Sequence, residues 1–193
     1  MKNKRLAIFA SGTGSNAVNL IRSFSTDDRI EVAFVLSNKS DAKVLQSARE
    51  LGVDSYCFTN AEVANGTFLK DFCEEHQIDW IVLAGYLRLI PAELIRAYDG
   101  KMINLHPALL PNYGGKGMHG RNVHEAVIAN KEKGSGISIH FVNEEFDKGR
   151  LIAQFHCTLN HTDTVDTLEA KIRYLEQTYL PAVVRGTLLN ENL

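Results

Sequence analysis

The stretch "IFASGTGSNAVNLI", Ile8 to Ile21, contains the end of an apolar run, a turn with two glycines and the beginning of a helix-like segment. The apolar residues of Leu6–Ala10 predict a β-strand, and Asn16–Ser25 has the pattern of an α-helix. Glycine permits the backbone conformations that a tight turn between them requires. We therefore predict that the chain begins with the strand, turn and helix of a βαβ unit.

The same alternation of short apolar runs and longer helical segments continues along the chain. "DWIVLAG", Asp79 to Gly85, is nearly continuous in apolar residues, as expected of a central strand that is covered on both faces. We predict a three-layer, doubly wound α/β fold with a mostly parallel sheet and a Rossmann-type N-terminal half. The predicted strands are Leu6–Ala10, Glu31–Ser37, Trp80–Ala84, Lys101–Asn104, Ile137–Val142 and Leu151–Cys157, and the early helices are Asn16–Ser25, Asp41–Leu51 and Thr67–His76.

The pattern changes in the second half of the chain. "GISIHFVN" and "LIAQFHC" are neighbouring strand-like runs, and the "EEFDKG" between them is typical of a hairpin. These strands predict an antiparallel edge on the otherwise parallel sheet. From Thr164 to about Arg185, apolar residues recur at three- and four-residue steps, which predicts a closing helix.

Composition narrows the class of protein. With 193 residues, 45% of them apolar, residues 1–193 are expected to form one globular domain. A net charge of −2 argues against nucleic acid as a partner, and no apolar run approaches the length of a membrane span. Cys57, Cys73 and Cys157 lack metal or redox spacing and are expected to be buried thiols. We predict a cytoplasmic protein that binds small molecules, either as a monomer or as a homodimer.

The glycine turn allows three interpretations. Gly12, Gly14 and Ala17 match the G-x-G-x-x-A spacing of dinucleotide-binding proteins. That site also needs an acid at the end of the second strand, where this chain has Ser37 and Asn38. Alternatively, free N–H groups at the start of the following helix bind a phosphate. The third interpretation is a tight, capped turn that holds no ligand.

The segment "INLHPALLP" brings an amide and an imidazole together. Asn104 and His106 are two residues apart in an extended segment, so their side chains point to the same side. Such a pair suits stabilisation of an oxyanion together with transfer of a proton. Asp147, in the predicted hairpin, is a candidate carboxylate that would raise the pKa of the imidazole. The alternative is a capping asparagine, a core histidine and a turn aspartate without catalytic roles.

Other chemistries find little support in the sequence. His119 and His124 are five residues apart and no H-E-x-x-H motif occurs, so a zinc site is not expected. The chain also lacks a G-x-S-x-G nucleophile turn, and none of the cysteines has a local nucleophile signature. Lys116, in the run "GGKG", could contact an anion, but lysines in such loops are usually just solvated.

Four motifs, taken in order, resemble the phosphoribosylglycinamide formyltransferase family. They are "ASGTGSN", "LAGYLRLI", "INLHPALLP" and "IHFVNEEFDKGRLIAQ", and the similarity covers nearly the whole chain. "NLHPALLP" followed later by D-x-G is typical of the formyltetrahydrofolate-using superfamily as a whole. The "GTGSN" loop narrows the resemblance to the glycinamide ribonucleotide branch.

The resemblance implies a formyltransferase-like fold, a reaction and a set of roles. In that family the formyl group of the co-substrate 10-formyltetrahydrofolate passes directly to the amine of N1-(5-phospho-D-ribosyl)glycinamide, in de novo purine biosynthesis and without a metal. The implied catalytic residues are Asn104, His106 and Asp147. The implied nucleotide-binding residues are Gly14, Ser15, Asn16, Ala17, Val18 and Glu176, and the implied folate-binding residues are Leu87, Arg88, Leu89, Ile90, Asn104, Asn143, Glu144, Glu145, Phe146 and Asp147.

The expected mechanism assigns one task to each member of the catalytic trio. Asn104 and His106 would donate hydrogen bonds to the oxyanion of the tetrahedral intermediate. Asp147 would keep His106 protonated, so that the imidazole also helps to return a proton to N10 of the folate.

Within the single domain, about residues 1–100 are expected to form a phosphate-binding half and about residues 101–193 a catalytic and folate-binding half. Two features depart from the family pattern. Asn65 and Gly66 stand where some members have a folate-contacting arginine. "YGGKGMHG" is longer and richer in glycine than in many relatives, and we expect it to be a lid or a substrate-contacting loop.

Four other functions share some of these features. Formyltetrahydrofolate hydrolases resemble this core but carry an additional N-terminal domain, which is not expected before Met1. Methionyl-tRNA formyltransferases add a C-terminal domain and a basic surface, whereas this chain ends at Leu193 with a net negative charge. The glycine spacing fits a nicotinamide-dependent dehydrogenase, but the acidic residue that such an enzyme needs is missing. A ligand sensor without activity would need the phosphate loop alone.

Overall fold

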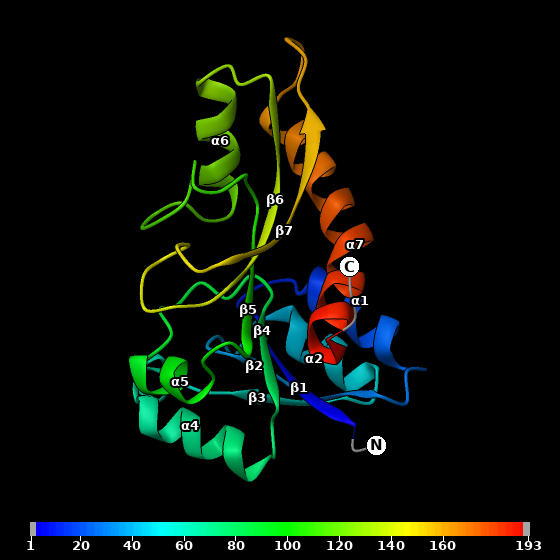
Figure 1. Ribbon diagram of the computed structural model, residues 1–193, viewed down its shortest axis with the longest axis vertical. Coiled ribbons are helices and arrows are strands. Elements are labelled where there is room, and N and C mark those ends of the chain that lie inside the picture. Colours follow the sequence, from blue (N-terminus) through cyan, green and yellow to red (C-terminus); the bar gives the residue numbers. More distant parts are fainter. Residues whose placement is uncertain (1–2, 191–193) are drawn as a thin grey trace.

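A sheet runs through the molecule along its long axis (Figure 1). The computed structural model describes residues 3–190, and within them seven strands pair side by side in the order β3-β2-β1-β4-β5-β6-β7. The strands are β1 (Lys4–Phe9), β2 (Ile30–Ser37), β3 (Asp54–Cys57), β4 (Trp80–Leu83), β5 (Met102–His106), β6 (Gly134–Phe141) and β7 (Leu151–Thr158).

The pairing of these strands decides where a ligand can enter. β1 pairs in parallel with β2 and β4, and the β2–β3 and β4–β5 pairs are parallel as well. β6 pairs antiparallel with β5, and β7 antiparallel with β6. The prediction of a mostly parallel sheet with an antiparallel edge is therefore confirmed. The order of winding reverses between β1 and β4, which leaves a crevice at the carboxyl ends of these strands, the usual ligand position in open α/β sheets.

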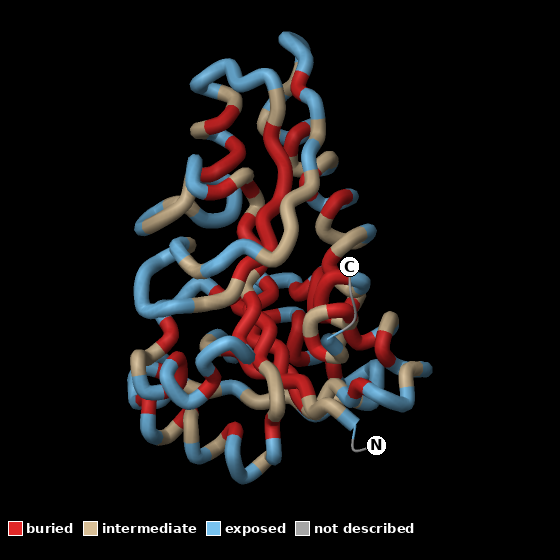
Figure 2. The backbone as a smooth tube through the Cα atoms, viewed as in Figure 1, coloured by how far each residue is buried: buried red, intermediate tan, exposed pale blue. Residues whose placement is uncertain are grey.

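Helices cover both faces of the sheet and make the fold three layers thick (Figure 1). Successive residues of β1 alternate between the two faces: Leu6 and Ile8 pack on one side, Ala7 and Phe9 on the other. Figure 2 shows that buried residues are concentrated along the strands between the helical layers. The first face carries α1 (Ser15–Phe24), α2 (Lys43–Glu50) and α7 (Val165–Leu189), the second α3 (Asn60–Ala64), α4 (Gly66–Glu75) and α5 (Ala92–Ala97), and α6 (Arg121–Ala129) packs against α7.

Some local features differ from the sequence-based expectation. The pattern of the sequence does not reveal β3, α3, α5 and α6. Of these, β3, α3 and α5 are only 4, 5 and 6 residues long, too short to show a clear periodicity. β5 continues to His106, two residues beyond the predicted end at Asn104, because its last residues pair with β6. Cys57 is exposed on the edge strand and Cys157 is half-buried, so the expectation of three buried thiols is wrong for these two.

The closing helix α7 contains a proline and runs to Leu189 rather than to about Arg185. Pro181 has no N–H, so the carbonyl of Gln177, four residues earlier, receives no helical hydrogen bond. The side-chain amide of Asn19 on α1 donates to that carbonyl at 2.8 Å. The proline therefore leaves a free acceptor that ties α7 to α1. Within residues 3–190 no helix, α7 included, is long and apolar enough to cross a membrane.

Candidate active site

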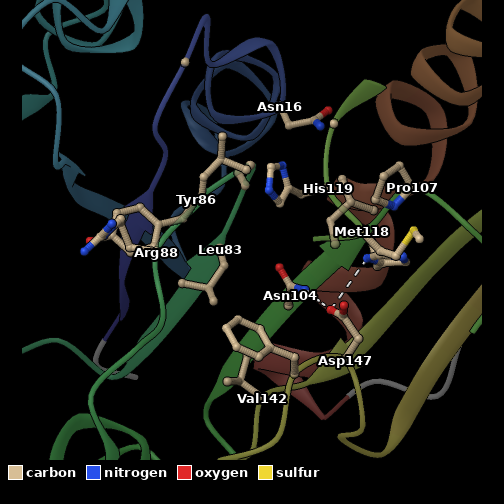
Figure 3. A pocket seen from close by; sticks show the side chains of 18 of the residues that line it. Asn16, Leu83, Tyr86, Arg88, Asn104, Pro107, Met118, His119, Val142 and Asp147 are labelled. Atoms are coloured by element: carbon tan, nitrogen blue, oxygen red, sulfur yellow. Dashed lines mark hydrogen bonds and ion pairs between the residues drawn. The ribbon is translucent and has the colours of Figure 1, made fainter. Parts of the chain in front are cut away.

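A cavity of about 540 Å³ opens at the carboxyl ends of the central strands. Its walls come from the glycine turn, the loop after β4, the segment after β5, the β6–β7 connection and α7. Figure 3 shows that these segments, far apart in the sequence, place side chains such as Asn16, Asn104 and Asp147 around a common space. The cavity therefore lies at the crevice where the winding of the sheet reverses.

Gly14 directly precedes helix α1 and lets the turn pass close to α2. Its φ of 74° is left-handed, and a Cβ at this position would collide with Val44. Residues 12–16 line the cavity, and the first N–H groups of a helix have no helical acceptor. Such a turn favours an anion. Ala17 is fully buried, and neither it nor Val18 lines the cavity, so these two members of the predicted nucleotide-binding set lie behind the wall.

The end of β2 is used differently from what a dinucleotide site requires. Ser11 donates its hydroxyl hydrogen to Oδ1 of Asn38 at 2.7 Å and accepts the N–H of Leu87 at 3.0 Å. Nδ2 of Asn38 in turn donates to Oδ1 of Asn60 at 3.0 Å. Because Ser11 is 2% exposed, its hydroxyl joins the ends of β1 and β2 to the loop after β4 inside the protein. A structural amide thus stands where a ribose-binding acid would be.

We expect Ser11→Ala to lower the free energy of unfolding by about 1–3 kcal/mol, because it removes the partner of the Leu87 N–H and of the Asn38 amide oxygen. Ser135→Ala is the matched control: Ser135 is 3% exposed, and its hydroxyl has no hydrogen-bond partner within residues 3–190. Urea denaturation of both variants measures the difference. Equal losses would contradict the role assigned to the Ser11 hydroxyl.

β5 and the β6–β7 connection bring Asn104, His106 and Asp147 together. Asn104 and His106 both lie on β5, and Asp147 reaches both of their side chains. Nδ2 of Asn104 donates to Oδ1 of Asp147 at 3.3 Å, and Nδ1 of His106 lies 3.5 Å from the same oxygen. His106 is 3% exposed, so its ring is held by the protein around it. The three residues form one cluster in the cavity wall.

His140, which the sequence motifs do not single out, completes this cluster. It is 2% exposed and stands opposite Asn104 in the β5–β6 pair. Its Nδ1 lies 2.8 Å from the carbonyl oxygen of Phe141, and its Nε2 lies 3.1 Å from Nδ2 of Asn104. A carbonyl only accepts and an amide nitrogen only donates, so Nδ1 carries the proton and Nε2 accepts. His140 and Asp147 therefore hold the nitrogen of the Asn104 amide towards themselves. Figure 3 shows the Asn104 oxygen on the side away from Asp147.

The glycine-rich loop holds His106 and Asp147 from another side. Nε2 of His106 donates to the carbonyl oxygen of Tyr113 at 2.8 Å, and the N–H of Gly115 donates to Oδ2 of Asp147 at 2.9 Å. The hydroxyl of Tyr113 donates to Glu132 at 2.6 Å, which anchors the beginning of the loop. Residues 115–120 then line the cavity. The start of this loop is therefore part of the cluster, and the rest of it faces the ligand space.

Burial and hydrogen bonding act in opposite directions on these groups. Burial lowers the pKa of His106 below its ordinary value, and the Asp147 carboxylate and the Tyr113 carbonyl oppose this only in part. The expected upward influence of Asp147 is present, but the net shift is downward. Burial alone would raise the pKa of Asp147, yet hydrogen bonding, including that from the Gly115 N–H, holds it below its ordinary value. Asp147 is therefore ionised at neutral pH, and additional negative charge near His106 would favour its protonation.

The segments expected to contact a folate form an apolar rim. Leu87, Leu89 and Phe146 are large apolar side chains with exposed fractions of 49%, 59% and 47%. An open apolar rim beside a few polar groups is typical of a site for a flat organic ligand. The other members of the predicted set that line the cavity are Arg88, Ile90, Asn104, Asn143, Glu145 and Asp147.

Three residues in segments that the family resemblance connects with the folate do not line the cavity. Glu144 pairs with Arg96 at 3.1 Å and does not line the cavity, so its position does not favour a folate contact. Asn65 caps α4 by accepting the N–H of Phe68 at 3.1 Å. Gly66 follows it in the first turn of α4, and neither residue lines the cavity. The segment with the missing arginine therefore has a helix-capping function.

Helix α7 contributes a carboxylate near the glycine turn. Glu176 lines the cavity, and Nδ2 of Asn16 donates to its Oε2 at 2.9 Å. Burial raises the pKa of Glu176, although the hydrogen bond from Asn16 and the charge of Arg173 act against this. Arg173, three residues earlier on the same helix, also lines the cavity, as does His119. Sequence reasoning missed Arg173, although its i, i+3 spacing to Glu176 places both on neighbouring positions of one helix face.

The fold and the cavity together define a class of protein. An asparagine, a histidine and an aspartate meet at the end of β5, between an anion-favouring turn and an apolar rim. In the part of the chain that the structure describes, no three His, Cys, Asp or Glu side chains are grouped to hold a metal ion. Residues 4–184 match the Formyl transferase family. The fold, the site and this match define a formyltransferase.

Individual relatives identify the branch. The chain is 37% identical over 199 aligned positions to a chloroplastic phosphoribosylglycinamide formyltransferase of Arabidopsis thaliana, covering 100% of this chain and 68% of that one. It is 34% identical to the phosphoribosylglycinamide formyltransferase of Bacillus subtilis (strain 168), covering 96% and 95%. The crystal structure of that enzyme from Streptococcus pneumoniae TIGR4 superposes with a TM-score of 0.84 at 36% identity, covering 95% and 98%. The chain belongs to the phosphoribosylglycinamide formyltransferase family.

Proposed function

We propose that the protein transfers the formyl group of 10-formyltetrahydrofolate to the amine of N1-(5-phospho-D-ribosyl)glycinamide in de novo purine biosynthesis. The main support for this proposal is the cluster of Asn104, His106 and Asp147. It lies in one cavity whose two ends differ in chemical character. One end suits a phosphorylated nucleotide and the other a flat folate. Family membership supports formyl transfer, and the names of the relatives supply the nucleotide.

The nucleotide would lie along the glycine turn and α7. Its phosphate would accept hydrogen bonds from backbone N–H groups of residues 14–16, at the positive end of the α1 dipole. Arg173, which pairs with Glu169 at 2.9 Å, would add a positive charge from α7. Glu176, in its ionised form, would accept polar hydrogens of the nucleotide. Ala17 and Val18 would support this turn from behind, without side-chain contact to the ligand.

The folate would lie along the apolar rim, with its pteridine towards the backbone of Leu87–Ile90 and of the β6–β7 connection. Leu87–Ile90 belongs to the first half of the chain, whereas Glu176, assigned to the nucleotide, belongs to the second. We therefore propose one domain in which both halves contribute to both ligands, rather than one half for each ligand. Each ligand then spans the crevice and brings its reacting atom to β5.

The proposed chemistry forms one C–N bond and breaks another. The amine nitrogen attacks the formyl carbon, and the electrons of the C=O bond move to its oxygen. The contact between Asn104 Nδ2 and Asp147 is 3.3 Å, long for a hydrogen bond, so a nearby oxyanion can take over this donor. Nδ1 of His106 faces the same space, and the new negative charge favours its protonation. As the bond from carbon to N10 breaks, a proton lost by the amine is returned to N10 through His106.

We expect Asn104→Ala to lower kcat by about 100-fold, because it removes one donor to the oxyanion. The Kd of the nucleotide should change little, since Asn104 is on β5 and the phosphate lies at α1. Steady-state kinetics and calorimetric titration measure the two quantities. Asn160→Ala, in the exposed turn before α7, serves as the control with unchanged kcat. A kcat near that of the wild type in Asn104→Ala would rule out this donor.

A single assay tests the proposed function against its alternatives. The protein is incubated with 10-formyltetrahydrofolate, with and without the glycinamide nucleotide, and the deformylated folate is followed. Release that requires the nucleotide, together with formylated nucleotide, supports the transferase. Release without the nucleotide would instead indicate a formyltetrahydrofolate hydrolase. An absence of release combined with binding of a nicotinamide cofactor would favour a dehydrogenase and overturn the proposal.

A further inference from the structure

A row of polar groups leads from outside the cavity to the carboxylate of Glu176. Of the residues that the structure describes, the cavity walls include Asn16 and Glu176 but not Gln177. Nε2 of Gln177 donates to Oδ1 of Asn16 at 2.8 Å, and Nδ2 of Asn16 donates to Oε2 of Glu176 at 2.9 Å. The amide of Asn16 therefore stands between an outer amide and a cavity-lining carboxylate.

The chemistry of the Asn16 amide decides which of its atoms faces Gln177 and which faces Glu176. Its oxygen only accepts and its nitrogen only donates. The donor on Gln177 holds the oxygen towards itself, which leaves the nitrogen for Glu176. In the reversed orientation, two oxygens would face each other at Glu176 and two nitrogens at Gln177. Because Asn16 is 8% exposed, water is poorly placed to satisfy these groups, and the reversal is disfavoured.

Gln177 is held in place by its own main chain. Pro181 cannot donate to the Gln177 carbonyl, and Nδ2 of Asn19 donates to it instead at 2.8 Å. Asn16 and Asn19 are three residues apart on α1 and share one helix face. Gln177 is therefore bonded to α1 through both its carbonyl and its side chain, and only the side-chain bond reaches the Asn16 amide.

We propose that Gln177 is a positioning residue that orients the Asn16 amide, so that Glu176 keeps a hydrogen-bond donor and remains an acceptor for polar hydrogens of the nucleotide. This inference rests on the proposed function, which places the nucleotide beside Glu176. Gln177 does not touch the ligand in this arrangement. Its effect on Glu176 passes through the Asn16 amide.

The charge of Glu176 makes this role measurable. Burial raises the pKa of Glu176, and the Asn16 hydrogen bond is the largest influence that lowers it. Loss of that donor therefore raises the pKa further and increases the protonated fraction at any given pH. The charges of Arg173 and Glu169, on its own helix, also act on this pKa, and Lys116, His119 and His124 line the same cavity from the glycine-rich loop and α6.

The test uses Gln177→Met, which keeps the length of the side chain and removes its donor without adding a charge. kcat/KM for the nucleotide is measured against pH at saturating 10-formyltetrahydrofolate. We expect the acid limb of the profile to move to higher pH by about 0.5–1 unit, a roughly three- to tenfold loss on the acid side. In a Glu176→Gln background, the same substitution is expected to move nothing, because no carboxylate is left to titrate there.

Asn19→Ala is the matched control. It removes the other hydrogen bond between α1 and Gln177 and leaves the Asn16 amide bonded as before. It should lower the melting temperature without moving the acid limb. An unmoved limb in Gln177→Met, an equal movement in Asn19→Ala, or a movement that persists in the Glu176→Gln background would overturn the inference.

The proposed function and this inference can fail separately. A wild-type protein that transfers no formyl group to the nucleotide would overturn the proposed function. Calorimetric binding of the nucleotide over the same pH range then decides the role of Gln177 without catalysis. Weakening that sets in at higher pH for Gln177→Met than for the wild type supports the inference, and identical binding profiles overturn it.

Discussion

Asp147→Asn is expected to lower kcat by on the order of 10³, the largest loss from any single substitution considered. Asp147 accepts hydrogen bonds from Asn104 and from the Gly115 N–H and lies beside His106. An amide at this position keeps the shape but loses the charge, and its NH₂ group would face other donors. The φ of Asp147 is 55°, which asparagine tolerates as well as aspartate, so the backbone should be retained.

The pH dependence of Asp147→Asn separates an electrostatic role from a structural one. The carboxylate is the largest influence that raises the pKa of His106, against the lowering effect of burial. Its removal lowers that pKa further, so the alkaline limb of kcat should move to lower pH. Asp163→Asn is the control, because Asp163 pairs with Lys171 at 2.7 Å outside the cavity. An unmoved limb in Asp147→Asn would show that Asp147 does not govern the charge of His106.

His106→Ala is expected to lower kcat by about 10²–10³, because it removes both a donor to the oxyanion and the group that returns a proton to N10. Nε2 of His106 is committed to the Tyr113 carbonyl at 2.8 Å. Nδ1, 3.5 Å from Asp147, is therefore the nitrogen that can donate a hydrogen bond to a substrate oxygen once it is protonated. Single-turnover kinetics measure the chemical step, and the Kd of the nucleotide should remain close to that of the wild type.

His76→Ala is the control for His106→Ala. His76 is half-buried on the far face of the sheet, where its ring contacts the Phe72 carbonyl and the Tyr56 hydroxyl. We expect this control to cost stability and leave kcat unchanged. Turnover near the wild-type value in His106→Ala would remove the histidine from the mechanism. Loss of nucleotide binding in that variant would instead mean that His106 supports the fold of the site.

Much of the fold could be predicted because its signals are local. The apolar run Leu6–Ala10 and the alternation around it predict a strand and helix without knowledge of any contact. The antiparallel edge could be inferred because the β6–β7 connection is too short for a crossover. The short elements β3 and α5 escaped, since four or six residues carry too little periodicity.

The candidate site could be predicted in part, for a similar reason. Asn104 and His106 share one side of a strand by their spacing alone. Gly14 is required by a left-handed turn next to a neighbouring helix, and glycine is readable in the sequence. Assignment of Asp147 to the same cluster needed a family resemblance, because 43 positions separate it from Asn104 and no local rule spans them.

The sequence by itself therefore determined the order and type of the main elements, the glycine turn and the side that Asn104 and His106 share. Tertiary structure alone decided that His140 orients Asn104 and that the glycine-rich loop holds His106 and Asp147. It also decided that Gln177 reaches Asn16. The physical reason is that periodicity acts over a few residues along the chain. Strand register, helix packing and burial join residues that no periodicity relates, and these set the hydrogen-bond partners and pKa values of the site.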